Sequence, residues 1–507
     1  MGSQRRWAAL AVLSAALALV SLDNTIVNVA LPTLQEDLGA TTSQLQWVVD
    51  AYSVMFAGTL LLAGSLGDRF GRRRMLLVGL AIFIAASAFG ALSPNADALT
   101  LARALMGVGG AFIMPSTLSI LVQVFEEPRE RAQAIGIWAA VAGVGVALGP
   151  ILGGVLLEHF TWHAIFWVNP IFSAAVIIAV LAFVPESSDP TRPRLDPLGA
   201  VLSSLGLIAL VFTIIELPEA GLAPSTVGGA LLAIAMLGLF AWWEKRAPRP
   251  ILPLALFRDR LFATAVAIVG LVYFSLMGAM FFLPQFLQLV QGMSPLQSGL
   301  SLLPGAGGLL VASVLSPRLA ARWGSRRTIV LGLGVVALAM LAMAMVSAHT
   351  GYAYTGACLG MIGAGLGLAL PQATNGVLAS VPHERAGMGS AVNDAMGELG
   401  GAFGVAILGG IMASFYRDAI EQAISAAGDS VKLLPPGALD AARESLAAAS
   451  IEASRLPADV AAVFDQVAGN AFVSGMTWAL LVGAGVAAAG MLVAWRRFPA
   501  HVERVEE

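Results

Sequence analysis

The sequence predicts an all-α membrane protein with fourteen transmembrane helices, arranged as two six-helix bundles with two extra spans between them. The first observation is composition: of 507 residues, 58% are hydrophobic and only 12% are charged, whereas soluble domains usually carry about 25% charged residues. The second is a series of fourteen apolar segments, each long enough to cross a bilayer. The third is that motifs of the first half recur in the second half.

The spans follow from segment length, because about 20 mostly apolar residues cross the hydrocarbon core. Strands are excluded, since open sheet edges do not persist in hydrocarbon. Residues 1–23 resemble a cleavable signal peptide, but the apolar run continues to Leu31, so we expect an uncleaved first span. The predicted spans are 7–31, 45–66, 75–93, 97–122, 133–157, 163–184, 198–217, 225–244, 262–289, 298–320, 328–347, 352–380, 386–415 and 469–495.

Basic residues set the expected orientation. If the N-terminus lies in the cytoplasm, most of the 28 Lys and Arg residues fall in inward segments, as the positive-inside rule requires. The outward segments carry basic residues only in the long loop 416–468. We therefore expect a multi-pass protein of the cell inner membrane with both termini in the cytoplasm. The loop 416–468 reads as two or three short amphipathic helices outside the membrane.

An internal repeat relates the two halves. Gly107-Val108-Gly109 recurs 256 residues later as Gly363-Ala364-Gly365, and Glu130-Arg131-Ala132 recurs 254 residues later as Glu384-Arg385-Ala386. The predicted organisation is a first bundle at 1–184, a linker with two extra spans at 185–261, and a second bundle at 262–507 that includes the loop 416–468. Substrate is expected to bind near the midplane between the halves.

The loop after the second span, Gly64 to Arg74, contains an aspartate and three glycines that charge bias alone does not explain. It resembles the signature loop of the major facilitator superfamily. The resemblance implies a clamp on the cytoplasmic side, in which Asp68 faces the start of a helix near Ala386-Gly387, where the helix dipole favours a carboxylate. The gating residues it implies are Asp68, Arg69, Gly71 and Arg72.

Two further stretches narrow the resemblance. The fifth span carries glycines at spacing four around Gly149-Pro150, which permits close helix packing and resembles the signature of antiporters in that superfamily. The segment from Leu22 to Pro32 is similar to the opening of the fourteen-span drug:proton antiporters, and the resemblance covers nearly the whole chain. The sequence departs from the family at Met106, often Gln there, and at Ala321, which replaces the aspartate of the loop in the second half.

Ionisable residues inside spans are candidates for function by default. Asp23, Asp50 and Arg103 fall at similar depth in the outer half of the first bundle. Arg103 is expected to neutralise one carboxylate, leaving the other to exchange protons, and a purely structural ion pair is the alternative. We expect Asp23 to be the titrating group, because Asn24, Thr25 and Asn28 give it a polar setting. In the resembling family, the aspartate of the first span and the arginine of the fourth span are linked to proton coupling.

The second half offers its own candidates for substrate or proton binding. Asp394 and Glu398 share one helix face at spacing four, and close carboxylates in a low-dielectric medium disfavour each other's ionised form. A hydrated polar lining is the alternative. Tyr273, Phe281 and Gln285 belong to an aromatic and methionine-rich ninth span suited to apolar ligands, although lipid and helix packing would use the same residues.

The expected function is a proton-coupled antiporter that exports small, largely apolar and possibly cationic compounds such as drugs, by alternating access. The alternatives are a transporter of the same fold for a metabolite, lipid precursor or siderophore, and an intramembrane enzyme. We find no hydrolase or zinc-protease motif, no Walker motif and no metal-binding histidine spacing. We therefore expect no catalytic residues, metal or cofactor. The net charge of −3 argues against nucleic acid, and the expected partners are substrate, protons and the lipid bilayer around a monomer.

Overall fold

The computed structural model describes residues 3–38, 40, 42–188, 196–248, 250–382, 385–427, 435–444 and 446–502. Among these residues, fourteen helices are long and apolar enough to cross a membrane, which confirms the predicted span count. The first six are α1 (Ser3–Leu38), α2 (Thr42–Phe70), α3 (Arg72–Ala91), α4 (Ala96–Val124), α5 (Pro128–His159) and α6 (His163–Phe183). The extra pair is α7 (Pro197–Ala220) and α8 (Pro224–Glu244).

The second half is built from six long helices and several short ones. The long helices are α9 (Arg260–Gln285), α11 (Leu303–Trp323), α12 (Ser325–Met343), α13 (Tyr352–Ala379), α14 (Ala386–Ala427) and α17 (Ala458–Arg497). The short ones are η1 (Leu254–Arg258), the π-helical turn η2 (Phe286–Val290), α10 (Pro295–Ser301), α15 (Pro436–Glu444) and α16 (Leu446–Ala453).

Two boundary predictions need correction. The predicted tenth span, 298–320, is broken at Leu302 between α10 and α11, because the following Pro304 lacks the amide hydrogen that would continue the helix. The predicted loop 416–468 is mostly helix, since α14 continues to Ala427 and α17 already begins at Ala458. The short helices α15 and α16 lie between them, in agreement with the two or three that were predicted.

Helix packing follows the internal repeat. In the first half α1 packs on α5, α2 on α4, and α3 on both α4 and α6. At the equivalent places of the second half α9 packs on α14, α11 on α13, and α12 on both α13 and α17. The halves meet through α2 against α14 and through α5 against α11, and α7 of the extra pair packs beside α2 and α14.

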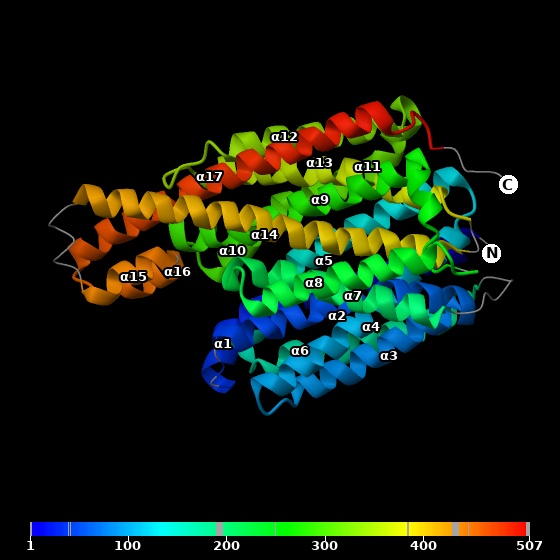
Figure 1. Ribbon diagram of the computed structural model, residues 1–507, viewed down its shortest axis with the longest axis horizontal. Helices are drawn as coiled ribbons and strands as arrows, with labels where there is room; N and C mark the ends of the chain where they lie inside the picture. Colours follow the sequence, from blue (N-terminus) through cyan, green and yellow to red (C-terminus); the bar gives the residue numbers. More distant parts are fainter. Residues whose placement is uncertain are drawn as a thin grey trace.

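The long helices run side by side, so the bundle has two ends (Figure 1). Both chain termini lie at one of them, where α1 begins and α17 ends, and we call this the termini end. Helices α15 and α16 lie at the opposite end, which we call the cap end. Tyr416 of α14 donates a hydrogen bond from its hydroxyl to the Ala442 carbonyl at 2.8 Å, which fixes α15 to the extension of α14.

Candidate functional site

A cavity of about 1100 Å³ lies between the two halves. Its walls come from α1, α2, α4, α5 and α7 on one side and from α9, α11, α13, α14, α16 and α17 on the other. The lining is largely aromatic, aliphatic and methionine, with two carboxylates, Asp50 and Glu398, and one arginine, Arg417. Such a cavity is large enough for a drug-sized molecule and offers it mainly apolar contacts.

The cavity extends toward the cap end but stops short of the termini end. Arg417 and Leu446 line it beside α15 and α16. On α2 the lining residues fall between Leu45 and Phe56, and Asp68 is about three helical turns further toward the termini end. The described structure is therefore closed between the cavity and the termini end.

The predicted residues of the ninth span lie on the cavity wall. Tyr273, Met277, Phe281 and Gln285 line the cavity, and their spacing of four places them on one face of α9. The Gln285 amide donates to the Phe281 carbonyl at 2.9 Å, one turn back along the helix. This face of α9 is turned to the cavity rather than to lipid, so the predicted candidates are positioned to contact a substrate.

The two carboxylates of α14 differ in their surroundings. Glu398 is half-buried and lines the cavity, whereas Asp394, one turn earlier, is 6% exposed and is not part of the lining. One Asp394 carboxylate oxygen accepts a hydrogen bond from the Asn393 amide at 3.1 Å, and its other oxygen has no partner among the described residues. The two groups lie close enough to repel each other electrostatically.

A sealed ion pair occupies the first half. Asp23 of α1 and Arg103 of α4 are both 0% exposed, and the Arg103 Nη1 is 2.5 Å from the Asp23 Oδ2. The other Asp23 oxygen accepts a hydrogen bond from the Asn169 amide of α6 at 2.6 Å. Arg103 also donates from Nε to the Val48 carbonyl at 3.1 Å. A buried pair of this kind is held by geometry on several helices, and removal of one partner leaves an uncompensated charge.

The polar setting of Asp23 differs from the predicted one. We expected Arg103 to leave Asp23 free in a shell made by Asn24, Thr25 and Asn28. Instead Asp23 is the carboxylate that Arg103 binds, because α4 and α6 bring Arg103 and Asn169 to it. Thr25 donates to backbone carbonyls of its own helix, Asn24 lines the cavity, and the side chain of Asn28 lies outside the described part of the chain.

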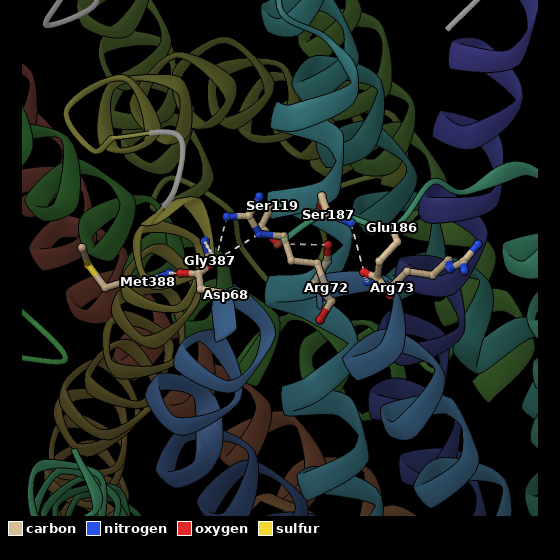
Figure 2. Close-up of polar contacts among 9 residues, drawn as sticks. Asp68, Arg72, Arg73, Ser119, Glu186, Ser187, Gly387 and Met388 are labelled. Atoms are coloured by element: carbon tan, nitrogen blue, oxygen red, sulfur yellow. Dashed lines mark hydrogen bonds and ion pairs between the residues drawn. The ribbon is translucent and has the colours of Figure 1, made fainter. Parts of the chain in front are cut away.

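A clamp joins α2 to α14 at the termini end (Figure 2). Asp68 is 4% exposed, and its two carboxylate oxygens accept hydrogen bonds from the backbone amides of Gly387 at 2.9 Å and Met388 at 3.1 Å. Arg72 binds the same carboxylate at 2.7 Å. These amides belong to the first turn of α14, where the helix dipole favours a negative charge. The predicted contact between Asp68 and the start of the thirteenth span is therefore confirmed.

Two glycines permit this approach of backbone to backbone. A methyl group at Gly387 would collide with the Asp68 carboxylate, and one at Gly64 would lie 2.6 Å from the Gly387 carbonyl oxygen. Gly71, between α2 and α3, has a φ of 112°, a value that L side chains rarely adopt. Two of the three glycines of the motif, Gly64 and Gly71, thus have identifiable roles at the clamp.

The segment after α6 braces the clamp from the other side. The Arg72 amide donates to the Ser187 carbonyl at 2.8 Å, and the Arg73 amide donates to the Glu186 carboxylate at 3.0 Å (Figure 2). Ser119 of α4 lies beside the Arg72 guanidinium in the same view. Arg69 is placed differently from Arg72, with its guanidinium over the Phe70 ring at 5.2 Å.

The glycines of the fifth span pack against α1 around Asp23. Methyl groups at Gly145 or Gly149 would collide with the backbone or side chains of α1 between Ala18 and Ile26. Pro150 is in the helix interior on the neighbouring face, in contact range of Gly299 of α10. The spacing of four therefore serves close packing of α5 on the helix that carries the buried carboxylate.

A profile of the Major Facilitator Superfamily matches residues 13–405. The chain belongs to this superfamily. It is 37% identical over 496 residues to the multidrug efflux pump LfrA of Mycolicibacterium smegmatis, covering 97% of each chain. It is 33% identical over 493 residues to the tetracenomycin C resistance and export protein of Streptomyces glaucescens, covering 97% of this chain and 91% of that one. The crystal structure of the human organic anion transporter MFSD10 shares the fold, with a TM-score of 0.64, 16% identity, and coverage of 97% and 100%.

Some residues of this major facilitator site were not singled out from the sequence. Asn169 is a polar residue inside the predicted sixth span, 163–184, so the sequence did offer it as a signal. Tyr52 falls in the predicted second span, 45–66, and its ring covers the Arg103 guanidinium. Glu186 had no signal, because its contact with the α2–α3 loop depends on how the bundle folds.

Proposed function

We propose that this major facilitator protein is a proton-coupled antiporter that exports small, largely apolar compounds, cationic ones included, by alternating access. The cavity between the halves carries the proposal: its aromatic and methionine walls suit varied apolar ligands, and its carboxylates, Asp50 and Glu398, suit a positive charge. The similarity to pumps named for multidrug efflux and for export of tetracenomycin C supports export over uptake.

We propose that the protein lies in the cell inner membrane with its termini end in the cytoplasm. The positive-inside rule supports this orientation, because the inward segments hold most of the Lys and Arg residues. In this orientation the cavity faces outward and the Asp68 clamp closes the cytoplasmic side. The cavity is bounded by helices of a single chain, which supports a monomer as the transporting unit.

The coupling site that we propose is the Asp23–Arg103 pair together with Asp50. In a low-dielectric interior, protonation of Asp23 requires that Arg103 withdraw from it, so proton uptake and a shift of α4 against α1 are linked. Asp50 lines the cavity within two residues of Val48, to which Arg103 is bonded. We propose that the Asp50 carboxylate relays protons between the outward side and the buried Asp23–Arg103 pair.

The gate that we propose is the clamp of Asp68, Arg69, Gly71 and Arg72 with the first turn of α14. Opening to the cytoplasm separates α2 from α14, which removes the two amide donors from Asp68. Gly149 and Pro150 set the packing of α5 on α1. Through this packing, movement at the coupling site is transmitted to the contact of α5 with α11 in the other half.

Two measurements test the proposal. A panel of toxic compounds applied to cells with and without the protein should show lower sensitivity, for several apolar cations, when the protein is present. In inside-out vesicles from the same cells, a protonophore should abolish transport of those compounds even with ATP present, since the proton gradient is the energy source. Transport that survives the protonophore and stops when ATP is removed refutes the antiporter.

A further inference from the structure

Tyr52 of α2 stands between the buried ion pair and the cavity. The Arg103 guanidinium carbon lies 4.6 Å from the centre of the Tyr52 ring, the geometry of a cation–π contact. The same residue lines the cavity, although it is only 2% exposed. The guanidinium thus contacts both the Asp23 carboxylate and this ring.

The ring has little freedom on the protein side. A methyl group at Gly107 of α4 would collide with the Tyr52 backbone carbonyl, and one at Gly110 would lie 2.6 Å from its hydroxyl oxygen. Phe56, one turn further along α2, stacks on the ring at 5.8 Å. The hydroxyl has no hydrogen-bond partner among the described residues. The contacts that position Tyr52 are therefore packing contacts and the guanidinium.

The second half also reaches this residue. Glu398 of α14, on the opposite cavity wall, is near enough to interact electrostatically with the Tyr52 hydroxyl, as are Asp23 and Arg103. A cation attracted to Glu398 would occupy the space beside Tyr52. It would repel Arg103 through the ring and push the guanidinium toward Asp23.

We propose that Tyr52 is the positioning residue that couples cavity occupancy to the proton on Asp23, by holding the Arg103 guanidinium against that carboxylate. The inference rests on the proposed proton coupling. With a cation in the cavity, the ring and the guanidinium are pressed toward Asp23, which favours its ionised form and releases a proton. When the cation leaves, the hold weakens and Asp23 takes up a proton.

Among the described residues, the charged groups around Asp23 and Tyr52 come from α2, α4 and α14, and they include Asp394, which interacts electrostatically with Glu398. Arg103 comes from α4, Asp50 from α2 and Glu398 from α14, and α6 contributes the neutral Asn169. The charged residues of α5 lie at the ends of that helix, and His163 lies at the start of α6. Those of α5 are Arg129, Glu130, Arg131 and Glu158. A pH effect of a Tyr52 substitution is therefore assigned to Asp23, Asp50 or Glu398, and the last two are tested by their own neutral variants.

The test is the pH dependence of ethidium transport by the full-length protein in inside-out vesicles. Tyr52→Leu should raise the pH midpoint of transport by about 0.5 to 1.5 units, the range expected for loss of a buried cation–π contact. Ethidium should also no longer release protons. Tyr52→Phe keeps the ring and should restore the wild-type midpoint. In Asp50→Asn and Glu398→Gln backgrounds, the shift caused by Tyr52→Leu should persist.

Phe56→Leu is the matched control, because Phe56 lines the same cavity and stacks on Tyr52, whereas the ring that lies under the Arg103 guanidinium is that of Tyr52. It should raise the KM for ethidium and leave the midpoint in place. If Tyr52→Leu does not reach the membrane, Tyr52→Met serves as a ringless variant of similar length. The inference is overturned if the pH midpoint does not move in the ringless variant, or if it moves equally in Phe56→Leu. In either case, proton-coupled ethidium transport by the wild-type protein would still support the proposed antiport.

Discussion

The two bundles share their helix packing but carry their charges at different places. At the termini end of the first half, Asp68 of α2 contacts α14, and Arg72, the first residue of α3, binds the Asp68 carboxylate. The equivalent residues of the second half are Ala321 of α11 and Ser325, the first residue of α12, and Ser325 donates to Gln372 of its own half at 3.0 Å. The contact of α11 with α5 uses small residues instead, with Gly136 against the Ser313 carbonyl. One of these two contacts thus contains a charged clamp, and its symmetry mate contains close packing of small, uncharged residues.

The same asymmetry holds deeper in the membrane. The first half buries its carboxylate, Asp23, in an ion pair across three helices, whereas the second half places Glu398 on the cavity wall. The internal repeat gives both halves the same helix packing, but the charged residues of the two halves lie in different surroundings. We infer that the first half controls coupling and gating and that the second half contributes more to substrate binding.

The largest effect is expected at Asp23, because the first half is assigned the coupling. Asp23→Asn leaves Arg103 without a counter-charge in the interior, a change that costs about 3–5 kcal/mol for a buried pair. Transport of a cationic and a neutral substrate, for example ethidium and Nile red, should be lost together. Efflux of both is measured at matched membrane levels of protein, and normal transport of both would remove Asp23 from the coupling.

Nearly as large a loss is expected at the clamp. Asp68→Asn keeps the side-chain volume but removes the charge that faces the first turn of α14 and binds Arg72. Transport should fall by about tenfold or more, with normal membrane levels. Ala321→Asn, at the equivalent place of the second half, is the matched control and should transport well. Equal loss in both variants would contradict the asymmetry between the two contacts.

A selective effect is expected in the second half. Glu398→Gln removes a charge from the cavity wall, and at roughly 8 Å in an effective dielectric of about 20 this is worth about 2 kcal/mol toward a cation. The KM for ethidium should rise by about 10- to 30-fold, with a smaller change for Nile red. Asp394→Asn should act in the same direction but more weakly, because Asp394 is outside the lining. Equal loss of ethidium and Nile red transport in either variant would contradict the assignment of substrate binding to the second half.

Backbone approach at the clamp gives a smaller and more local prediction. Gly387→Ala places a methyl group against the Asp68 carboxylate, and overpacking of this kind costs about 1–3 kcal/mol. We expect a reduction in transport of about tenfold. Gly389→Ala, two residues on, meets only side-chain atoms of Val381 and Leu378 and is the control. Transport assays of the pair decide whether the amide contacts of the clamp matter.

The smallest effect is expected at the neutral contact. Gly136→Ala places a methyl group 2.6 Å from the Ser313 carbonyl oxygen but breaks no charged interaction. Transport should fall by less than about fivefold. A loss as large as that of Gly387→Ala would show that the two contacts are energetically alike despite their different chemistry.

The sequence predicted the parts of the molecule that depend on local pattern. The fourteen spans follow from the length of the apolar segments. The family motif predicted that Asp68 faces the chain near Ala386-Gly387, and its observed partners are the amides of Gly387 and Met388. The continuation of α14 to Ala427 was also readable, since no glycine or proline occurs from 411 to 427. The prediction ended the helix at 415 because it followed hydropathy and did not use the absence of helix-breaking residues.

The rest depends on contacts between distant segments. Asn24 and Thr25 are the sequence neighbours of Asp23, but its actual partners come from α4 and α6, 80 and 146 residues away. Likewise, Glu186 binds the amide of Arg73 only because α6 ends beside the α2–α3 loop. Local sequence pattern does not say which distant segments pack together. The depth of each charge within its span nevertheless placed Asp23 and Arg103 at the same level of the membrane, where they meet.

Proton countertransport is the central claim, and proteoliposomes that contain a pH-sensitive dye test it directly. The purified full-length protein is reconstituted without nucleotide, a proton gradient is imposed, and ethidium is added to the side that the termini end faces. We predict that ethidium movement is accompanied by proton movement in the opposite direction and that both stop in Asp23→Asn. Ethidium transport at the full wild-type rate with no change in lumenal pH would contradict the proposed antiport.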